Sequence, residues 1–261
     1  MFLRRTATLF VALACASCSP WDYPVNIPFA ATWQGSAIDC NSDGAALSDL
    51  RFYVSNVQLI DDQGQAHDVR FATEMDWQND AVALIDLEDG SGACQNGTSG
   101  TSDHVLGVAT ARAYRGLRFT VGVPFRLNHE NPLTAKPPLD DPDMHWHWRS
   151  GYKFLRAGVR TATDGFWMHA GSAGCDGTVG NIAACRFPNR IEVYLPDFEV
   201  GVDTVNVDLS ALVADIDLDD DARSDCSSGP PEAACVAPFA ALGIEFASGK
   251  QNGAQRVFSA E

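Results

Sequence analysis

Basic side chains are scarce in this chain of 261 residues, with 18 lysines and arginines against 34 aspartates and glutamates. The resulting formal net charge of −16 argues against a nucleic-acid ligand, because such binding depends on clustered cations that neutralise phosphates. The same deficit disfavours anionic membrane surfaces as partners. A soluble exported protein, or one with a cationic partner, fits this charge.

Long apolar runs are absent beyond the N-terminus, which excludes a membrane-spanning helix in the rest of the chain. Arg4 and Arg5 precede a short apolar stretch at residues 9–14, a pattern typical of a secretory signal. We therefore expect a signal peptide over residues 1–18 and a single domain over residues 19–261.

Cysteines at the end of this segment raise the question of a lipid anchor. Cys18 is the preferred candidate for lipidation and Cys15 is the alternative, although neither has the usual Leu three positions earlier. Simple cleavage near Ala16 remains open. The expected location is extracytoplasmic in a bacterium, either periplasmic or as an outer-membrane or cell-surface lipoprotein.

The six remaining cysteines contain no CxxC spacing, which disfavours a zinc site of thiolates. An even number of cysteines in an exported chain predicts three disulfides, for which fifteen connectivities exist. Proximity in sequence favours the pairs Cys40–Cys94, Cys175–Cys185 and Cys226–Cys235.

Several enzyme motifs are also missing, namely GxSxG, a Walker loop and HExxH. No residue stands out as a nucleophile or a general base. We therefore expect a protein that is not an enzyme.

The hydrophobic pattern has a period of two, which predicts an all-β, single-domain antiparallel β-sandwich with long loops, stabilised by disulfides. The alternating runs are residues 50–60, 117–125, 191–195 and 205–209. In the first run the apolar phase changes near Ser55 and Asn56, which predicts a β-bulge. Residues 82–87 suit a central strand, and only residues 105–114 and part of 209–216 are compatible with short helices.

Histidine and tryptophan concentrate in one region, where three of six His and three of six Trp fall within 25 residues. In an extended chain His145 and His147 share one face, while Trp146 and Trp148 share the other. His169 is the strongest further ligand candidate, and His129 the next. Nitrogen ligands with Met residues beside them favour copper over zinc.

A run of carboxylates at residues 215–221 offers hard oxygen ligands, so Ca²⁺ is a weaker candidate there. The run lacks the Gly and the distal Glu of an EF-hand loop. A solvated acidic loop is the simpler interpretation.

A group of longer motifs resembles the MbnP-like family, also described as the four-Cys member of a metallo-mystery pair. The matching segments are DLRFYVSNV (49–57), LIDLED (84–89), GLRFTVGVP (116–124), MHW (144–146), GYKFLR (151–156), and His169 with Gly171, Ser172, Gly174 and Cys175. The resemblance spans residues 29–246, and the motifs occur in order. The six mature cysteines exceed the four in the family's description.

This resemblance implies an exported copper-binding protein that acts in copper acquisition or homeostasis. It also implies a partner, a di-haem cytochrome c peroxidase-like (MauG-like) protein, which oxidises a Trp to kynurenine. Carried onto this chain, His145 and His169 become the expected ligands, and Trp146, or otherwise Trp148, the oxidised residue. His147 occupies a position that the family leaves variable.

Two alternatives stay open at this point. A metal-free β-sandwich recognition module would bind carbohydrate or a cell-surface ligand through a Trp/His groove. A metal-dependent enzyme would need a metal with an open coordination position.

Overall fold

The computed structural model describes residues 22–95, 97–162, 165–218, 225–229 and 232–261. The expected signal segment, with Cys15 and Cys18, lies outside the described residues, as do Asp219, Asp220 and Asp221. Within the described ranges, none of the helices has the length and apolar character needed to cross a membrane.

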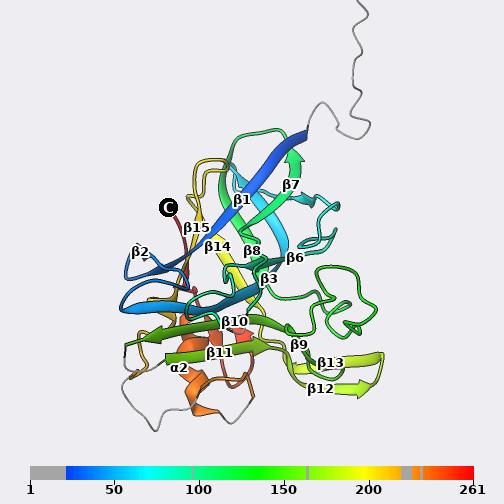
Figure 1. Ribbon diagram of the computed structural model, residues 1–261. Coiled ribbons are helices and arrows are strands. Elements are labelled where there is room, and N and C mark those ends of the chain that lie inside the picture. The colour runs from blue at the N-terminus through cyan, green and yellow to red at the C-terminus, as the bar shows by residue number, and fades with distance from the viewer. Residues whose placement is uncertain (1–21, 96, 163–164, 219–224, 230–231) are drawn as a thin grey trace, which may run out of the picture.

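The chain forms two main sheets (Figure 1). The six-stranded sheet has the order β18-β15-β1-β7-β5, with β2 beside β1. Its strands are β1 (Asp22–Trp33), β2 (Ser36–Ala37), β5 (Arg70–Phe71), β7 (His104–Thr110), β15 (Val205–Asp208) and β18 (Phe258–Ala260). The pairing of β1 with β15 is parallel, which departs from a purely antiparallel sandwich.

The eight-stranded sheet has the order β11-β10-β3-β8-β14, with β4 and β6 paired to β3, and β9 paired to β10. Its strands are β3 (Ala45–Asp61), β4 (Ala66–Asp68), β6 (Val82–Asp86), β8 (Tyr114–Val121), β9 (His145–His147), β10 (Gly151–Thr161), β11 (Gly165–Gly171) and β14 (Ile191–Leu195). All of its pairings are antiparallel.

Smaller elements complete the described part of the chain. Two hairpins are formed by β12 (Ala173–Thr178) with β13 (Asn181–Phe187), and by β16 (Ile244–Glu245) with β17 (Lys250–Gln251). The helical segments are α1 (Leu209–Leu212), η1 (Ala233–Cys235) and α2 (Val236–Ala241). The β12–β13 hairpin projects at one end of β10 and β11 (Figure 1).

Four phenylalanine rings join the two sheets. Phe29 and Phe258 come from the six-stranded sheet, and Phe52 and Phe119 from the eight-stranded sheet. Their ring centroids lie 5.5–5.8 Å apart in edge-to-face contacts, and all four side chains are buried. Such contacts stabilise a core beyond the area that they bury. The all-β sandwich expected from the alternating pattern is thereby confirmed.

Several expectations about single elements can be compared with the structure. The bulge is present, since the β3–β8 register shifts between Ser55 and Gln58 and Asn56 has a φ of 52°. Residues 105–114, whose pattern is compatible with a short helix, instead form most of β7, which pairs with β1 and β5, and the first residue of β8. The short helix near Leu209 is present, whereas α2 was not expected.

The apolar run at residues 82–87 forms β6, which is buried along its whole length. It pairs with β3, and isolated bridges from Gln78 and Ser102 cover it further. Burial by loops, rather than a central position in the sheet, therefore explains its continuous hydrophobicity.

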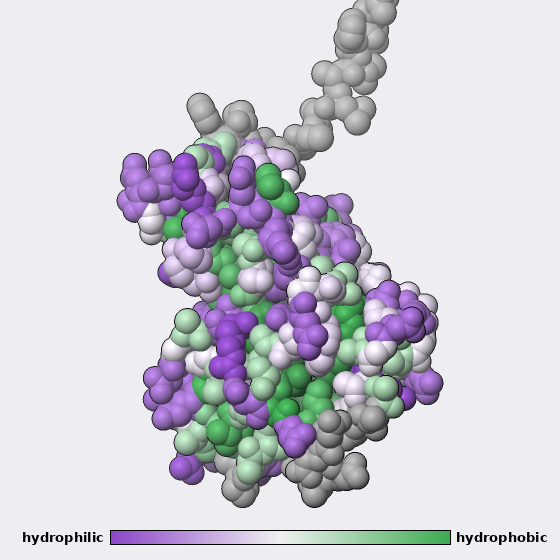
Figure 2. Space-filling model, turned by 90° about the vertical axis from the view of Figure 1, so that its left-hand side faces the viewer, coloured by the Kyte–Doolittle hydropathy of each residue, from purple (hydrophilic) through white to green (hydrophobic). Residues whose placement is uncertain are grey.

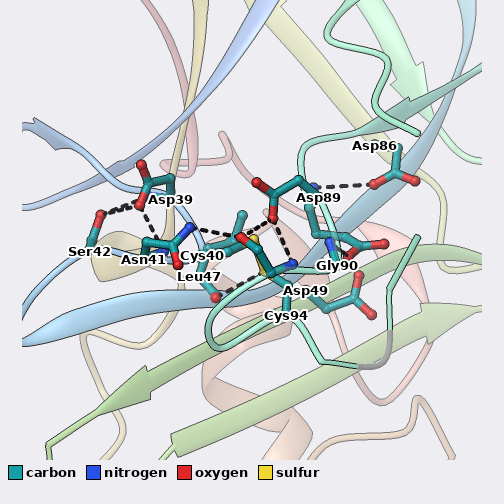
Figure 3. Close-up of a disulfide and its surroundings, with 12 residues drawn as sticks. Asp39, Cys40, Asn41, Ser42, Leu47, Asp49, Asp86, Asp89, Gly90 and Cys94 are labelled. Carbon is teal, nitrogen blue, oxygen red and sulfur yellow. Dashed lines mark hydrogen bonds between the residues drawn. A yellow bond between two sulfur atoms is a disulfide. The ribbon is translucent and has the colours of Figure 1, made fainter. Parts of the chain in front are cut away.

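The three expected disulfides are formed, between Cys40 and Cys94, Cys175 and Cys185, and Cys226 and Cys235. Cys40–Cys94 joins the loop before β3 to the loop after β6, and the Cys94 Sγ lies 3.2 Å from the Leu47 carbonyl oxygen (Figure 3). Disulfides of this number are typical of proteins that fold outside the cytoplasm.

The surface changes in character from one end of the molecule to the other. Figure 2 shows hydrophilic side chains over the upper part of one face and an area of hydrophobic side chains in its lower part.

A buried ion cluster holds β10 against β3. Arg51 and Arg156 face each other directly across these strands, a like-charge pairing that is unfavourable by itself. The Asp49 carboxylate lies between them, with its Oδ2 2.8 Å from the Arg51 Nη2 and 2.6 Å from the Arg156 Nη2. All three residues are at most 9% exposed, so their charges depend on one another for neutralisation.

Replacing Asp49 by Asn should therefore lower the free energy of unfolding by about 3–5 kcal/mol, because the buried Arg156 loses its carboxylate partner and Arg51 keeps only Glu88, at 3.8 Å. Urea denaturation measures this difference. The exposed Asp62→Asn serves as a charge-matched control and should change stability by less than about 0.5 kcal/mol. Equal stabilities of the two variants would contradict the proposed role of the cluster.

Asp86 provides a second test, through pH. Burial, followed by the charge of Glu88, raises the pKa of Asp86 to about 7. The folded state thus holds a proton that the unfolded chain releases near its ordinary value of 3.8, so this contribution to stability is lost as the pH rises through 7.

In Asp86→Asn the amide oxygen can still accept the Glu88 backbone N–H, which the Asp86 Oδ1 accepts at 3.2 Å. We expect the variant to match the wild type near pH 4 and to exceed its unfolding free energy above pH 7. A constant difference between the two proteins across this range would contradict the shifted pKa.

Candidate metal centre

The segment with the His and Trp residues is extended, as expected, and forms β9 against the start of β10. His147 lies opposite Gly151, and His145 lies opposite Tyr152. The Lys153 N–H donates to the Met144 carbonyl at 2.7 Å, and Lys153 also pairs with Gly171 of β11. Lys153 therefore connects the strand that carries His145 to the strand that carries His169.

Two of the four candidate histidines have both ring nitrogens engaged. The His147 ring is exposed, with Nδ1 3.2 Å from the Arg149 backbone N and Nε2 3.2 Å from the Ser150 Oγ. The His129 Nδ1 lies 3.2 Å from the Trp148 carbonyl oxygen, and its Nε2 lies 3.3 Å from the Asn128 Nδ2. Each nitrogen of these two rings thus already has a polar partner in the folded protein.

The other two histidines differ in this respect. The Nε2 atoms of His145 and His169 are buried and have no hydrogen-bond partner among the described residues. Leaving a buried polar nitrogen unpaired costs stability, and such atoms call for an explanation. Coordination of a metal ion by these Nε2 atoms would explain why they have no hydrogen-bond partner.

The electrostatic surroundings keep these imidazoles neutral. Burial, then the charges of Arg156 and Lys153, lowers the pKa of His169 to about 4. Burial, then His147 and Lys153, lowers the pKa of His145. A neutral imidazole retains the lone pair that a metal requires. Both side chains are thus in the protonation state of a ligand at neutral pH.

The tryptophans lie on both sides of this region. The six-membered ring of Trp146 packs on Gly171, where a Cβ would come within 2.6 Å of the Trp146 Cζ3. Trp146 therefore reaches the strand of His169. The ring centroids of Trp167 and His169 lie 6.4 Å apart in an edge-to-face arrangement, as residues on the same face of β11. Gly171 thus provides the space that brings Trp146 to this face.

His145 and Trp148 line a hollow of about 540 Å³ together with His129. Phe125 and residues 179–182, at the tip of the β12–β13 hairpin, form its other walls. The His145 ring also packs edge-to-face on Tyr152, with centroids 5.0 Å apart. His145 and Trp146 thus point to different sides of β9, as alternation along a strand predicts.

The structure therefore divides the sequence-predicted residues into two groups. One group is His129, His145 and Trp148 at the hollow, and the other is Trp146 and His169, the latter on β11. Sequence reasoning missed Lys153, whose charge acts on both imidazoles, and Arg156, whose charge acts on His169. Simple alternation gave no signal for this pair, because the two residues are three positions apart and the β10–β11 register shifts between Lys153 and Leu155.

The acidic run at residues 215–221 is described only up to residue 218. Asp215 forms an ion pair with Arg256, so its carboxylate already has a cationic partner. Ca²⁺ binding at this run stays a prediction.

The chain is thus an all-β sandwich with three disulfides, of the extracytoplasmic type. Its candidate metal centre is the His/Trp strand beside the hollow. The MbnP family model matches residues 22–228, so the chain belongs to the MbnP family.

A solved structure, MbnP from Methylosinus trichosporium, is similar to this chain, with 27% sequence identity and a TM-score of 0.79. The similarity covers 92% of this chain and 98% of that chain. No curated protein matches the chain at a significant level.

The contact between Trp146 and Gly171 can be tested by Gly171→Ala. The added Cβ would meet the Trp146 ring and the Tyr152 carbonyl oxygen, at 2.6 and 2.7 Å, so we expect a loss of about 1–3 kcal/mol and a shift in Trp fluorescence. Gly100→Ala is the control, because its nearest neighbour would be 3.9 Å away. An unchanged emission spectrum in Gly171→Ala would place Trp146 elsewhere.

Proposed function

We propose that this protein binds copper outside the cytoplasm, in copper acquisition or homeostasis. Its candidate ligands are the Nε2 atom of His145, beside the hollow, and the Nε2 atom of His169, on β11. The observation that carries the proposal is the pair of buried, neutral imidazoles whose Nε2 atoms have no partner among the described residues. Membership of the MbnP family supports it. The protein would act as a binding protein and not as an enzyme.

The donor set fits a borderline metal ion. Imidazole nitrogens suit copper, and all six cysteines of the described chain are consumed in disulfides, so thiolates do not compete. Met144 and Met168 do not add to this set, because both are fully buried in the hydrophobic core. Bound copper would supply the Lewis acidity and redox chemistry that the chain itself lacks.

Trp146 is the residue that we propose is oxidised to kynurenine, with Trp148 as the alternative. This oxidation opens the five-membered ring and leaves the six-membered ring with an amine and a ketone. The part of Trp146 that packs on Gly171 is the part that survives. The contact would therefore hold the new amine and carbonyl near the strand of His169.

A di-haem cytochrome c peroxidase-like (MauG-like) protein is the proposed oxidant. High-valent haem iron can withdraw electrons from an indole, and the protein provides placement. The net charge of −16 would favour association with a cationic face of that partner, and added salt would weaken it. Cleavage or lipidation at Cys18 would decide whether the protein is free in the periplasm or anchored.

The hollow beside His145 favours one alternative function. Trp148 and Phe125 give it apolar walls, which suit a carbohydrate or another small ligand. A metal-free recognition module would use this hollow without involving His169.

Copper content and peptide mass of protein from the native host test the proposal. We expect about one equivalent of copper, and a peptide of residues 144–149 in which Trp146 has gained an oxygen and lost a carbon. Substituting a residue that only contacts a ligand typically weakens metal binding by about 10–100-fold. His145→Leu and His169→Leu remove the proposed ligands themselves, so each should weaken copper binding by more than that.

Thermal stability distinguishes a ligand from a structural histidine. Because the His169 Nε2 is unpaired, His169→Leu should leave the melting temperature of the copper-free protein unchanged or higher. His104→Gln, outside the site, is the control for copper affinity. Copper bound with wild-type affinity by both leucine variants would refute the proposed centre.

A further inference from the structure

The Cys175–Cys185 disulfide has a histidine beside it. These cysteines lie directly opposite each other in the β12–β13 hairpin, and the His129 ring comes from the loop before β9. The His129 Nε2 is 3.6 Å from the Cys185 Sγ. The Nε2 and the two Sγ atoms all lie within 4.8 Å of one another.

The orientation of His129 turns a lone pair toward the sulfurs. Its Nδ1 lies 3.2 Å from the Trp148 carbonyl oxygen, which only accepts hydrogen bonds, so Nδ1 carries the proton. Nε2 is then the unprotonated nitrogen, and it accepts from the Asn128 Nδ2 at 3.3 Å, a long contact that a bound metal ion would replace. A histidine that donates from one nitrogen to a backbone carbonyl and presents the other is the usual arrangement of a metal ligand.

The spacing agrees with that of a single metal ion. A tetrahedral centre with metal–sulfur and metal–nitrogen bonds of about 2.3 and 2.05 Å separates its S and N ligands by roughly 3.6 Å. The observed Nε2–Sγ distance is 3.6 Å. The sulfurs themselves, once freed from their bond, would need to separate to roughly 3.8 Å.

The other two disulfides lack these features. Cys40, Cys94, Cys226 and Cys235 are at most 2% exposed. Cys185 is half-buried, so a reductant can reach it. In the described part of the chain, only His129, Cys175 and Cys185 form such a group of three ligand atoms.

We propose that reduction of Cys175–Cys185 converts this group into a Cys₂His site for a thiophilic ion, Zn²⁺ or Cu⁺. The reductant is a protein or small-molecule dithiol, which gives two electrons and two protons to the S–S bond and becomes a disulfide itself. The ion then displaces the two thiol protons and bonds to both thiolates and the His129 Nε2. A fourth position remains for water or another small ligand.

The hairpin keeps the reduced sulfurs together. Its backbone ladder pairs Cys175 with Cys185, and also Ala173 with Phe187 and Asp176 with Ala184, without depending on the S–S bond. Oxidation state thus decides whether the ion binds. The site uses neither His145 nor His169, so it stands or falls independently of the copper centre.

The test uses the mature chain, reduced under native conditions and probed with Co²⁺ and Zn²⁺ alone. Thiol counting and peptide mapping should show that Cys175–Cys185 opens first. The reduced protein should bind one additional Co²⁺ with the strong near-ultraviolet absorption of thiolate coordination, and the oxidised protein should not. Zn²⁺ should displace it.

Matched variants define the ligands. His129→Gln should weaken Zn²⁺ binding to the reduced protein by at least about 10–100-fold, and Cys175→Ser with Cys185→Ser should abolish it. The pair Cys226→Ser with Cys235→Ser, with a similar sequence separation of 9 against 10, should retain it.

Either of two results would overturn the proposal. One is a reduced, folded protein, verified by circular dichroism, that binds no Co²⁺. The other is thiolate coordination that His129→Gln leaves at wild-type affinity. The His169→Leu variant, studied in parallel, would bind the additional ion normally even if the copper centre were absent.

Discussion

The Asp49 carboxylate determines where the candidate metal centre lies, because it neutralises two arginines that face each other across β3 and β10. β3 itself is fixed by the phenylalanine contacts between the sheets. β10 is held by its backbone pairing with β3 and by the Asp49 carboxylate, and β9 and β11 are both paired to β10. The positions of His145 and His169 thus depend on a strand between them that carries a buried charge which Asp49 must neutralise.

The same region contains two kinds of potential ligand with different requirements. The imidazoles of His145 and His169 are buried, neutral and free at Nε2, which makes them ready for a metal ion without any preceding reaction. The group around His129 needs a reduction first. One end of the eight-stranded sheet and its neighbouring hairpin would therefore bind metal ions under two different redox conditions.

Sequence patterns revealed the fold where the cause was local. The phase change at Asn56 correctly predicted a bulge, and short separations correctly paired the cysteines. The segment at residues 105–114 stayed ambiguous because its neighbours β1 and β5, and not its own periodicity, make most of it a strand. The distinction among four histidines also required the structure, since it depends on the ring orientations, which decide whether a nitrogen reaches a partner as in His147 or is buried without one as in His169. Likewise, no local signal places Trp146 on Gly171.

The segment around Cys226, which lies along β11, has a consequence for solubility. β11 is an end strand of its sheet, and an end strand offers unpaired N–H and C=O groups to any other chain. Here the Cys226 backbone occupies those groups, donating to the Trp167 carbonyl and accepting from the His169 N–H. Cys226–Cys235 fastens this segment to the body of the protein. The disulfide thereby protects the molecule from edge-to-edge aggregation as well as from unfolding.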